Sequence, residues 1–244
     1  MTIRRLDILG VQVCTLTATE AVAALDAWTR DAPVKLAYLN AHGSNLAASD
    51  PKFRDALNRF VVLNDGIGVD IAARLLHGRA FPENLNGTDF TVKYLQDTQR
   101  AWRVFLLGAK PGVAQAAMEK LKQLAPRHTY VGARDGYFSK EASSSIAAGV
   151  AQAEADLVLV ALGNPAQEFW IDEYGGATGA RLLVGVGALF DFLSGGVSRA
   201  PEWVRALRAE WVYRLMLEPR RLARRYVMGN PLFLARTLRR RLRL

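Results

Sequence analysis

The chain has 244 residues, of which 50% are hydrophobic, so it can bury one large core or a core with an appendage. Its single cysteine, Cys14, excludes an intrachain disulfide and any metal site built from several cysteines. The first residues lack the apolar run of a signal peptide, and no apolar run approaches the about 18 residues of a membrane span. We therefore expect a protein of a reducing compartment that does not cross a membrane.

The formal net charge of +9 is unevenly distributed along the chain. Residues 199–244 contain 13 Arg, no Lys and 3 Glu, a net charge of +10, which leaves −1 for residues 1–198. Such a basic tail indicates an anionic partner, and a membrane surface, a nucleic acid or a pyrophosphate group would each fit. We expect an α/β domain over residues 1–198 and a helical appendage over residues 199–244.

Short apolar runs alternate with amphipathic helical patterns through the first part of the chain. The predicted strands are residues 6–14, 34–39, 60–63, 104–107, 129–133, 156–162 and 181–187. The predicted helices are residues 17–30, 46–59, 68–77, 88–102, 113–125 and 140–153. This alternation predicts a mainly parallel, Rossmann-like sheet with helices on both faces.

The residues from 65 to 89 combine a carboxylate, glycines and a second polar turn. Asp65 and Gly66 follow a predicted strand, and ligands of open α/β sheets bind at such strand ends. Asn86 and Asp89 belong to a polar turn that precedes the next helix. A carboxylate in this place suits a general base that deprotonates a hydroxyl group. The alternative is that Asp65 only caps its helix, because Asp is a preferred N-cap.

Further polar clusters follow the other predicted strands. They are residues 40–45, 108–112, 135–138, 163–168 and 188–192. Because parallel strands end at the same edge of a sheet, we expect these clusters to meet along one rim. The turn at 108–112 resembles a phosphate-binding loop but lacks the third glycine of the dinucleotide fingerprint, so a plain connection explains it better.

Several common catalytic motifs are missing from the sequence. There is no zinc-type His/Cys set, no G-x-S-x-G elbow, no G-x-x-x-x-G-K-[ST] loop and no D-x-D pair of the kind that holds a metal against a nucleotide diphosphate. A reaction on this chain would therefore manage charge with helix N-termini, glycine-loop amides and arginines. We expect no metal and no cofactor.

The tail shows a helical pattern of a different kind. Apolar residues recur every four positions at Trp203, Leu207, Trp211 and Leu215, and Pro219 should end or kink this helix. For this stripe, packing on the main domain is at least as good an explanation as lipid contact. Residues 231–244 mix leucines with five arginines, a pattern that favours contact with a membrane interface or a partner subunit over the alternative, packing on the main domain.

Eight segments in chain order resemble the WecG/TagA/CpsF family of bacterial glycosyltransferases. They are LNAHGSNL (39–46), LNDGIGVDIAARLL (63–76), NGTDF (86–90), VFLLGA (104–109), DGYF (135–138), LVALGNPAQEFWI (159–171), VGVGALFDFLSGGVSRAPEW (184–203) and EWVYRLMLEPRRLARRY (210–226). The segments DGIGVDIA and NLNGTDF are most similar to exopolysaccharide glucosyltransferases of the xanthan-assembly kind.

The resemblance implies an inverting, metal-independent transferase that is attached peripherally to the inner, cytoplasmic face of the cell membrane. It would move a sugar from a UDP-sugar to a polyprenyl-diphosphate-linked sugar. Asp65 matches the family's catalytic base, and Asn40 matches the polar residue beside it. Gln167 would contact the donor, and Tyr137 and Asp191 would bind its uridine part.

Two further sets of residues follow from the same resemblance. The loops at Gly108 and Gly187 would approach the donor diphosphate. Arg214, Arg221 and Arg224 match arginines of the family tail that meet the lipid diphosphate or the departing UDP.

One departure from the family bears on the donor sugar. Family members that transfer N-acetylmannosamine-type sugars usually carry Arg where this chain has Asn84, and a family Thr is replaced by Tyr38. An Arg offers a fixed charge, whereas Asn offers only neutral hydrogen bonds. With Asn84, Asn86 and Asp89 in this part of the site, we expect a neutral hexose, glucose, and keep an N-acetylmannosamine or uronic-acid donor as the alternative.

Two other classes of function compete with this interpretation. An NAD(P)-binding oxidoreductase would use the glycine loop at 108–112, and a basic interaction protein would bind nucleic acid through the tail. The first lacks a complete fingerprint and the second lacks aromatic residues among the last arginines, so we expect no nucleic acid partner. A homo-oligomer that covers an apolar surface is left open.

Overall fold

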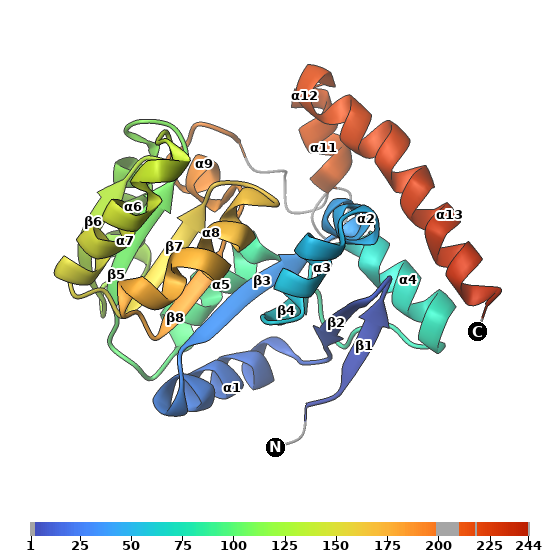
Figure 1. The fold of residues 1–244 in the computed structure, drawn as a ribbon, viewed down its shortest axis with the longest axis horizontal. Helices are drawn as coiled ribbons and strands as arrows, with labels where there is room; N and C mark the ends of the chain where they lie inside the picture. Colours follow the sequence, from blue (N-terminus) through green and yellow to red (C-terminus); the bar gives the residue numbers. More distant parts are fainter. Residues whose placement is uncertain (1–2, 199–209, 218, 244) are drawn as a thin grey trace.

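The computed structural model describes residues 3–198, 210–217 and 219–243. Its centre is a six-stranded sheet with the order β4-β3-β8-β7-β5-β6, in which every neighbouring pair is parallel (Figure 1). The strands are β3 Val34–Leu39, β4 Val61–Asn64, β5 Arg103–Gly108, β6 Thr129–Arg134, β7 Leu157–Ala161 and β8 Leu182–Gly185. The predicted parallel sheet with helices around it is confirmed.

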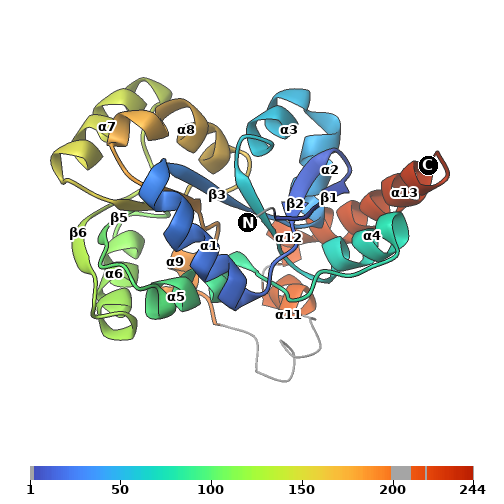
Figure 2. The ribbon, with the colours of Figure 1, turned by 90° about the horizontal axis from the view of Figure 1, so that it is seen from below.

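Helices cover both faces of the sheet, as Figure 2 shows. One face packs against α1 Ala18–Asp31, α5 Gly87–Asp97, α6 Val113–Leu124 and α9 Leu189–Leu193. The other packs against α2 Ala41–Ser49, α3 Pro51–Leu57, α4 Ile67–His77, α7 Ser143–Gln152 and α8 Ala166–Tyr174. Two short 3₁₀ turns, Lys140–Ala142 and Gly175–Thr178, adjoin α7 and α8. Successive residues of a strand point to opposite faces, which is why the described apolar residues divide into two buried clusters.

The prediction of one opening strand over residues 6–14 is wrong. This segment is a hairpin of β1 Arg5–Ile8 and β2 Val11–Cys14, which form a separate antiparallel sheet. Leu9 and Gly10, with φ values of 53° and 94°, both adopt the left-handed conformation, and such a pair closes a two-residue hairpin turn. Leucine is an unusual residue in this conformation, so the sequence carried no strong turn signal.

Capping explains where the helices begin. The side chain of Thr17 caps α1 in a capping box with Glu20, which confirms the predicted start of this helix. The predicted helix 46–59 begins too late, because Asn40 accepts a hydrogen bond from the Gly43 N–H at 3.0 Å and starts α2 at Ala41. Asp50 then caps a separate helix, α3.

The described part of the appendage consists of consecutive helices. They are α11 Glu210–Leu217, α12 Pro219–Ala223, a π-helical turn Arg224–Met228 (η3) and α13 Gly229–Arg241. Helix α12 starts at Pro219, and residue 218, which joins it to α11, lies outside the described residues, so the predicted end or kink at Pro219 stays a prediction. Trp203 and Leu207 of the predicted stripe lie outside the described residues. None of the helices in the ranges described is long and apolar enough to cross a membrane.

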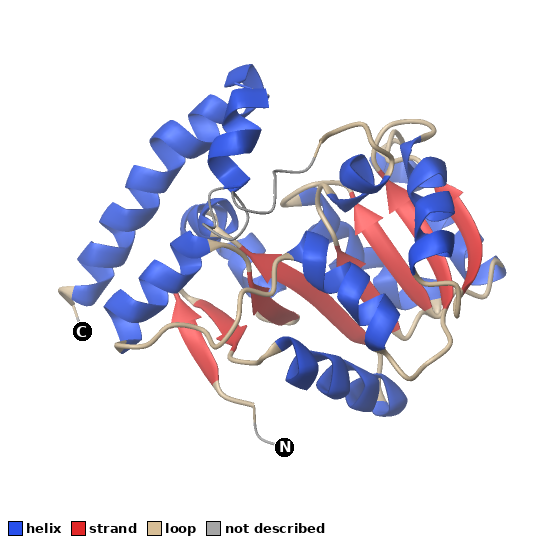
Figure 3. Ribbon diagram, turned by 180° about the vertical axis from the view of Figure 1, so that it is seen from behind, coloured by secondary structure: helices blue, strands red, loops and turns tan. Residues whose placement is uncertain are grey.

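Helix α13 packs lengthwise on α2 and α4, as Figures 1 and 3 show from opposite sides. Its inner side buries Phe233 and Thr237, and the Phe233 ring lies against Gly68 of α4. Its outer side leaves leucines exposed, most strongly Leu238 at 50% and Leu242 at 88%. The apolar residues of 231–244 therefore lie on two sides of the helix: one side packs on the α/β domain and the other is exposed.

Polar contacts tie α13 to α2 as well. Arg236 donates to the carbonyl oxygen of Asn45 at 2.8 Å and to Ser49 Oγ at 2.7 Å. Asn45 Nδ2 in turn donates to the carbonyl oxygen of Gly229 at 2.7 Å. The start and the middle of α13 are thus both hydrogen-bonded to α2, the helix that Asn40 caps.

Replacing Phe233 with Ala should loosen α13. Removal of a buried Phe ring costs about 3 kcal/mol or more, so protection of the α13 amides against hydrogen exchange should fall by about two orders of magnitude. Leu238→Ala, on the exposed side of the same helix, is the matched control and should change protection little. Equal protection in the two variants would contradict the packing described for Phe233.

Candidate active site

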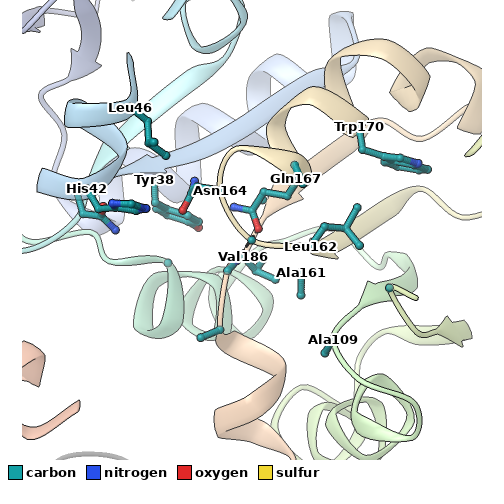
Figure 4. A pocket seen from close by; sticks show the side chains of 18 of the residues that line it. Tyr38, His42, Leu46, Ala109, Ala161, Leu162, Asn164, Gln167, Trp170 and Val186 are labelled. Carbon is teal, nitrogen blue, oxygen red and sulfur yellow. Dashed lines mark hydrogen bonds between the residues drawn. The ribbon is translucent and has the colours of Figure 1, made fainter. Parts of the chain in front are cut away.

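A cleft of about 2000 Å³ lies at the carboxyl edge of the sheet (Figure 4). Strands β3, β4, β7 and β8 all end at this edge because they run parallel. The residues predicted for the site that line the cleft are Asn40, Asp65, Tyr137, Gln167, Gly187 and Asp191. The strand ends therefore bring together residues from five separate parts of the sequence.

Asp65 and Asn40 contact each other at the ends of β4 and β3. The two strands pair so that Leu39 lies opposite Asn64, and the Asp65 N–H donates to the Leu39 carbonyl oxygen at 2.8 Å. Asn40 Nδ2 donates to Asp65 Oδ2 at 3.2 Å. Because Asn40 Oδ1 already accepts from the Gly43 N–H, the amide group is held with its nitrogen toward the carboxylate.

The alternative that Asp65 only caps α4 is wrong. The N-cap of α4 is Gly66, with φ 86° and no side-chain cap. The Asp65 side chain lines the cleft.

The segment from Glu83 to Asp89 is fastened to the Asp65 turn. Asn84 Oδ1 accepts from the Gly66 N–H at 2.7 Å, and Asn64 Nδ2 donates to the Glu83 carbonyl oxygen at 2.9 Å. Asn86 caps α5 by accepting from the Asp89 N–H at 2.9 Å. Asn84, Asn86 and Asp89 are not among the residues that line the cleft, whereas the intervening Gly87 and Thr88 are.

Gly108 has a structural reason to be glycine. Its φ is 132°, and a Cβ there would lie 2.4 Å from the carbonyl oxygen of Ala161 on the neighbouring strand. Gly108 itself does not line the cleft, but Ala109 and Lys110, which follow it, do. The glycine turn thus allows β5 and β7 to approach closely and places a lysine at the cleft.

The segment Gly163–Glu168 forms the side of the cleft next to β7 and β8. Gln167 Oε1 accepts from the Gly187 N–H at 3.1 Å, and Gln167 Nε2 donates to Glu168 Oε1 at 2.8 Å. Glu168 is fully buried, and this burial raises its pKa to about 7. Sequence reasoning included Asn164 and Glu168 only as members of a polar cluster and assigned them no role.

His42 and Arg225 were not predicted for the site, yet both line the cleft. His42 lies in the first turn of α2, and burial together with the charge of Arg225 lowers its pKa to about 4, so its ring is neutral at pH 7. The side chains of the predicted Arg214, Arg221 and Arg224 lie outside the described part. Arg225, next to Arg224 in the sequence, brings a charge of the appendage to the cleft.

No group of three or more His, Cys, Asp or Glu in the described ranges could hold a metal ion.

A model of the Glycosyl transferase WecG/TagA/CpsF family matches residues 6–244. The chain belongs to this family. The predicted resemblance to this family is therefore confirmed. The family match favours a glycosyltransferase over the alternative of an NAD(P)-binding oxidoreductase.

Two curated relatives share about a third of their residues with this glycosyltransferase. Both are called N-acetylglucosaminyldiphosphoundecaprenol N-acetyl-beta-D-mannosaminyltransferase. The one from Bacillus subtilis is 36% identical over 180 residues, and the one from Bacillus spizizenii is 34% identical over 180 residues. Each alignment covers 73% of this chain and 69% of the relative.

The lowered pKa of His42 leads to a pH prediction. In the unfolded state His42 should titrate near 6.5, and in the folded glycosyltransferase near 4. The unfolded chain binds the proton more readily between these values, so this residue's contribution to stability is present above pH 6.5 and is lost as the pH falls toward 4. An NMR titration of the His42 ring in folded and urea-unfolded protein measures both values.

Arg225→Ala separates the two causes of this shift. Burial is the larger one, so the pKa of His42 should rise in the variant but stay below 6.5. A folded-state pKa near 6.5 in the parent protein would contradict the placement of His42 in the closed part of the cleft.

Proposed function

We propose that the protein is an inverting, metal-independent glucosyltransferase of exopolysaccharide assembly. It moves glucose from UDP-glucose to a sugar linked to polyprenyl diphosphate. The observation that carries this proposal is the Asp65 carboxylate, held by Asn40 at the end of β4 and facing the same cleft as Gln167.

In the proposed reaction, Asp65 takes the proton of the acceptor hydroxyl as that oxygen attacks the anomeric carbon of the donor. A bond forms between the acceptor oxygen and this carbon, and the bond between the carbon and the UDP oxygen breaks. Attack from the side opposite to UDP inverts the configuration. Asn40 keeps the carboxylate in place without competing for the proton, because its N–H group is a donor.

The donor and the leaving group are assigned by their chemistry. We place the uridine part at Tyr137 and Asp191, the transferred sugar at Gln167 and the diphosphate near Gly187. Lys110 lines the cleft and would add a positive charge for the departing UDP. Arg214, Arg221 and Arg224 are proposed to meet the lipid diphosphate, as the family resemblance implies.

The acceptor class is supported by the relatives, whose names specify a diphosphoundecaprenol-linked sugar. The same names favour N-acetylmannosamine as a second candidate donor. Asn84 supports a neutral hexose through the sequence, because an uncharged residue stands where family members that transfer N-acetylmannosamine-type sugars usually carry Arg. Asn84 itself does not line the cleft, and its oxygen accepts from the Gly66 N–H beside Asp65. An arginine has no acceptor atom and could not make that hydrogen bond.

We further propose that the protein acts while attached peripherally to the inner face of the cell membrane. The outer side of α13 supports this proposal, because exposed Leu234, Leu238 and Leu242 lie beside exposed Arg239 and Arg241. A helix with an apolar side flanked by arginines suits the interface of a membrane with anionic lipids.

A UDP-release assay tests the proposed reaction. The protein is incubated with EDTA, a polyprenyl-diphosphate-linked glucose acceptor in detergent and one UDP-sugar at a time. Release with UDP-glucose is expected. Release only with UDP-N-acetylmannosamine or an acidic donor would overturn the glucose assignment, and loss of activity with EDTA would overturn metal independence.

Asp65→Asn should abolish most transfer in the same assay while UDP binding is retained. The variant keeps the shape of the side chain but removes the base, and such a loss typically costs about 10²- to 10⁴-fold in rate. Asp55→Asn, an exposed carboxylate on α3, is the matched control. Transfer by Asp65→Asn at near the parent rate would remove Asp65 from the role of base.

Replacing Arg239 and Arg241 with Gln should weaken binding to vesicles of anionic lipid. Each arginine near an anionic surface is worth about fivefold in affinity, so the double variant should bind about 30-fold more weakly in a sedimentation assay. The control is Lys120→Gln with Lys122→Gln, which removes the same charge from exposed positions of α6. Equal losses in both variants would contradict a docking role for α13.

A further inference from the structure

Glu168 is a buried acid that the proposed reaction does not use. It lies in the first turn of α8 and has no exposed surface, so it cannot touch a substrate in the cleft. Oε1 of its carboxyl group accepts two hydrogen bonds, from Asn164 Nδ2 at 2.5 Å and from Gln167 Nε2 at 2.8 Å. Both donors belong to amide side chains that line the cleft, as Figure 4 shows.

These bonds fix which way each amide group faces. Gln167 is held at both ends, since its Oε1 accepts from the Gly187 N–H at 3.1 Å while its Nε2 donates to Glu168. If the Gln167 amide were rotated by 180°, its N–H group would face the Gly187 N–H and its oxygen would face Glu168 Oε1, and both contacts would be unfavourable. Gly185 makes room for this arrangement, because a Cβ there would lie 3.0 Å from Gln167 Nε2.

The surroundings of the second oxygen of Glu168 favour the protonated, neutral form of its side chain. Oε2 is buried and has no hydrogen-bond partner among the described residues. An ionised carboxylate would leave charge on this unsolvated atom, whereas a proton on Oε2 leaves Oε1 as a neutral carbonyl oxygen that still accepts both amide bonds. Burial raises the pKa of Glu168 to about 7, in agreement with a large protonated fraction at neutral pH.

We propose that Glu168 is a positioning residue for the transferred sugar. By holding Asn164 and Gln167 in one orientation, it leaves Asn164 Oδ1 as an acceptor and one N–H of each amide as a donor outside these bonds, on two side chains that line the cleft. An acceptor oxygen matches a sugar hydroxyl and not a diphosphate, which has no proton to donate at neutral pH. The inference rests on the proposed function, in which this side of the cleft holds the donor sugar.

Calorimetric binding of UDP-glucose and of UDP alone tests the inference without requiring transfer. Glu168→Gln keeps an oxygen that accepts both bonds, so its affinity for both ligands should stay within about twofold of the parent. Glu168→Met has a similar size but no acceptor of this strength, and its UDP-glucose affinity should fall about tenfold while UDP affinity is unchanged. Glu168→Asp, whose carboxyl group is withdrawn by one methylene, should show the same selective loss and serves if Glu168→Met does not fold.

Four outcomes would overturn the inference. The first is that Glu168→Met or Glu168→Asp binds UDP-glucose with unchanged affinity, and the second is that these variants lose equal affinity for UDP and for UDP-glucose. The third is that Glu168→Gln loses as much UDP-glucose affinity as Glu168→Met. The fourth is that the parent protein does not bind UDP-glucose. The last outcome alone would also overturn the proposed function, so the two failures are distinguishable.

Discussion

The parallel pairing of β3 with β4 is the constraint on which the site depends. Because Leu39 lies opposite Asn64, the next residue of each strand, Asn40 and Asp65, must emerge side by side at the same edge. The backbone bond from Asp65 to Leu39 extends the pairing by one step and fixes the height at which the carboxylate leaves the sheet. The contact between the two side chains is thus a consequence of strand register, and a slip by one residue would separate them.

The appendage depends on this same pair of strands. Helices α2 and α4 begin directly after β3 and β4, so their first turns hold Asn40 and Gly66. Helix α13 lies across both helices, with Phe233 against α4 and Arg236 against α2. The last described helix therefore packs against the two helices that position Asn40 and Asp65, the proposed catalytic pair, while η3 beside it brings Arg225 to the cleft.

Much of this structure could be predicted from the sequence, and the failures have physical reasons. Strand 34–39 and the start of the helix predicted over residues 17–30 depend on local patterns, so they were predicted correctly. The hairpin at Leu9 was missed because a leucine gives no sign of a left-handed turn. Packing of residues 231–244 on the α/β domain was only the less favoured interpretation, because their apolar spacing is the same whether the partner is lipid or another helix.

In the site, too, features set by neighbouring residues could be predicted, whereas contacts between residues far apart in the sequence could not. Asp65 could be named because it follows a strand, and the cluster 40–45 could be placed near it because strand ends meet in parallel sheets. Asn40 was singled out within that cluster by the family resemblance. The contact of Asn84 with the Gly66 N–H joins residues 18 positions apart, and nothing in the spacing predicts it. Glu168 could not be told from an exposed helical glutamate, because its burial depends on how α8 sits against β7 and β8.

The two sides of α13 differ in how freely they can be redesigned. Phe233 and Thr237 are enclosed, and Arg236 is matched to particular atoms of Asn45 and Ser49, so these positions tolerate little change. Leu238 and Leu242 contribute mainly exposed surface. Polar residues at these outer positions would give a more soluble form for crystallisation and solution work, in which the cleft, the contact between Asn40 and Asp65 and the packing of α13 are intact.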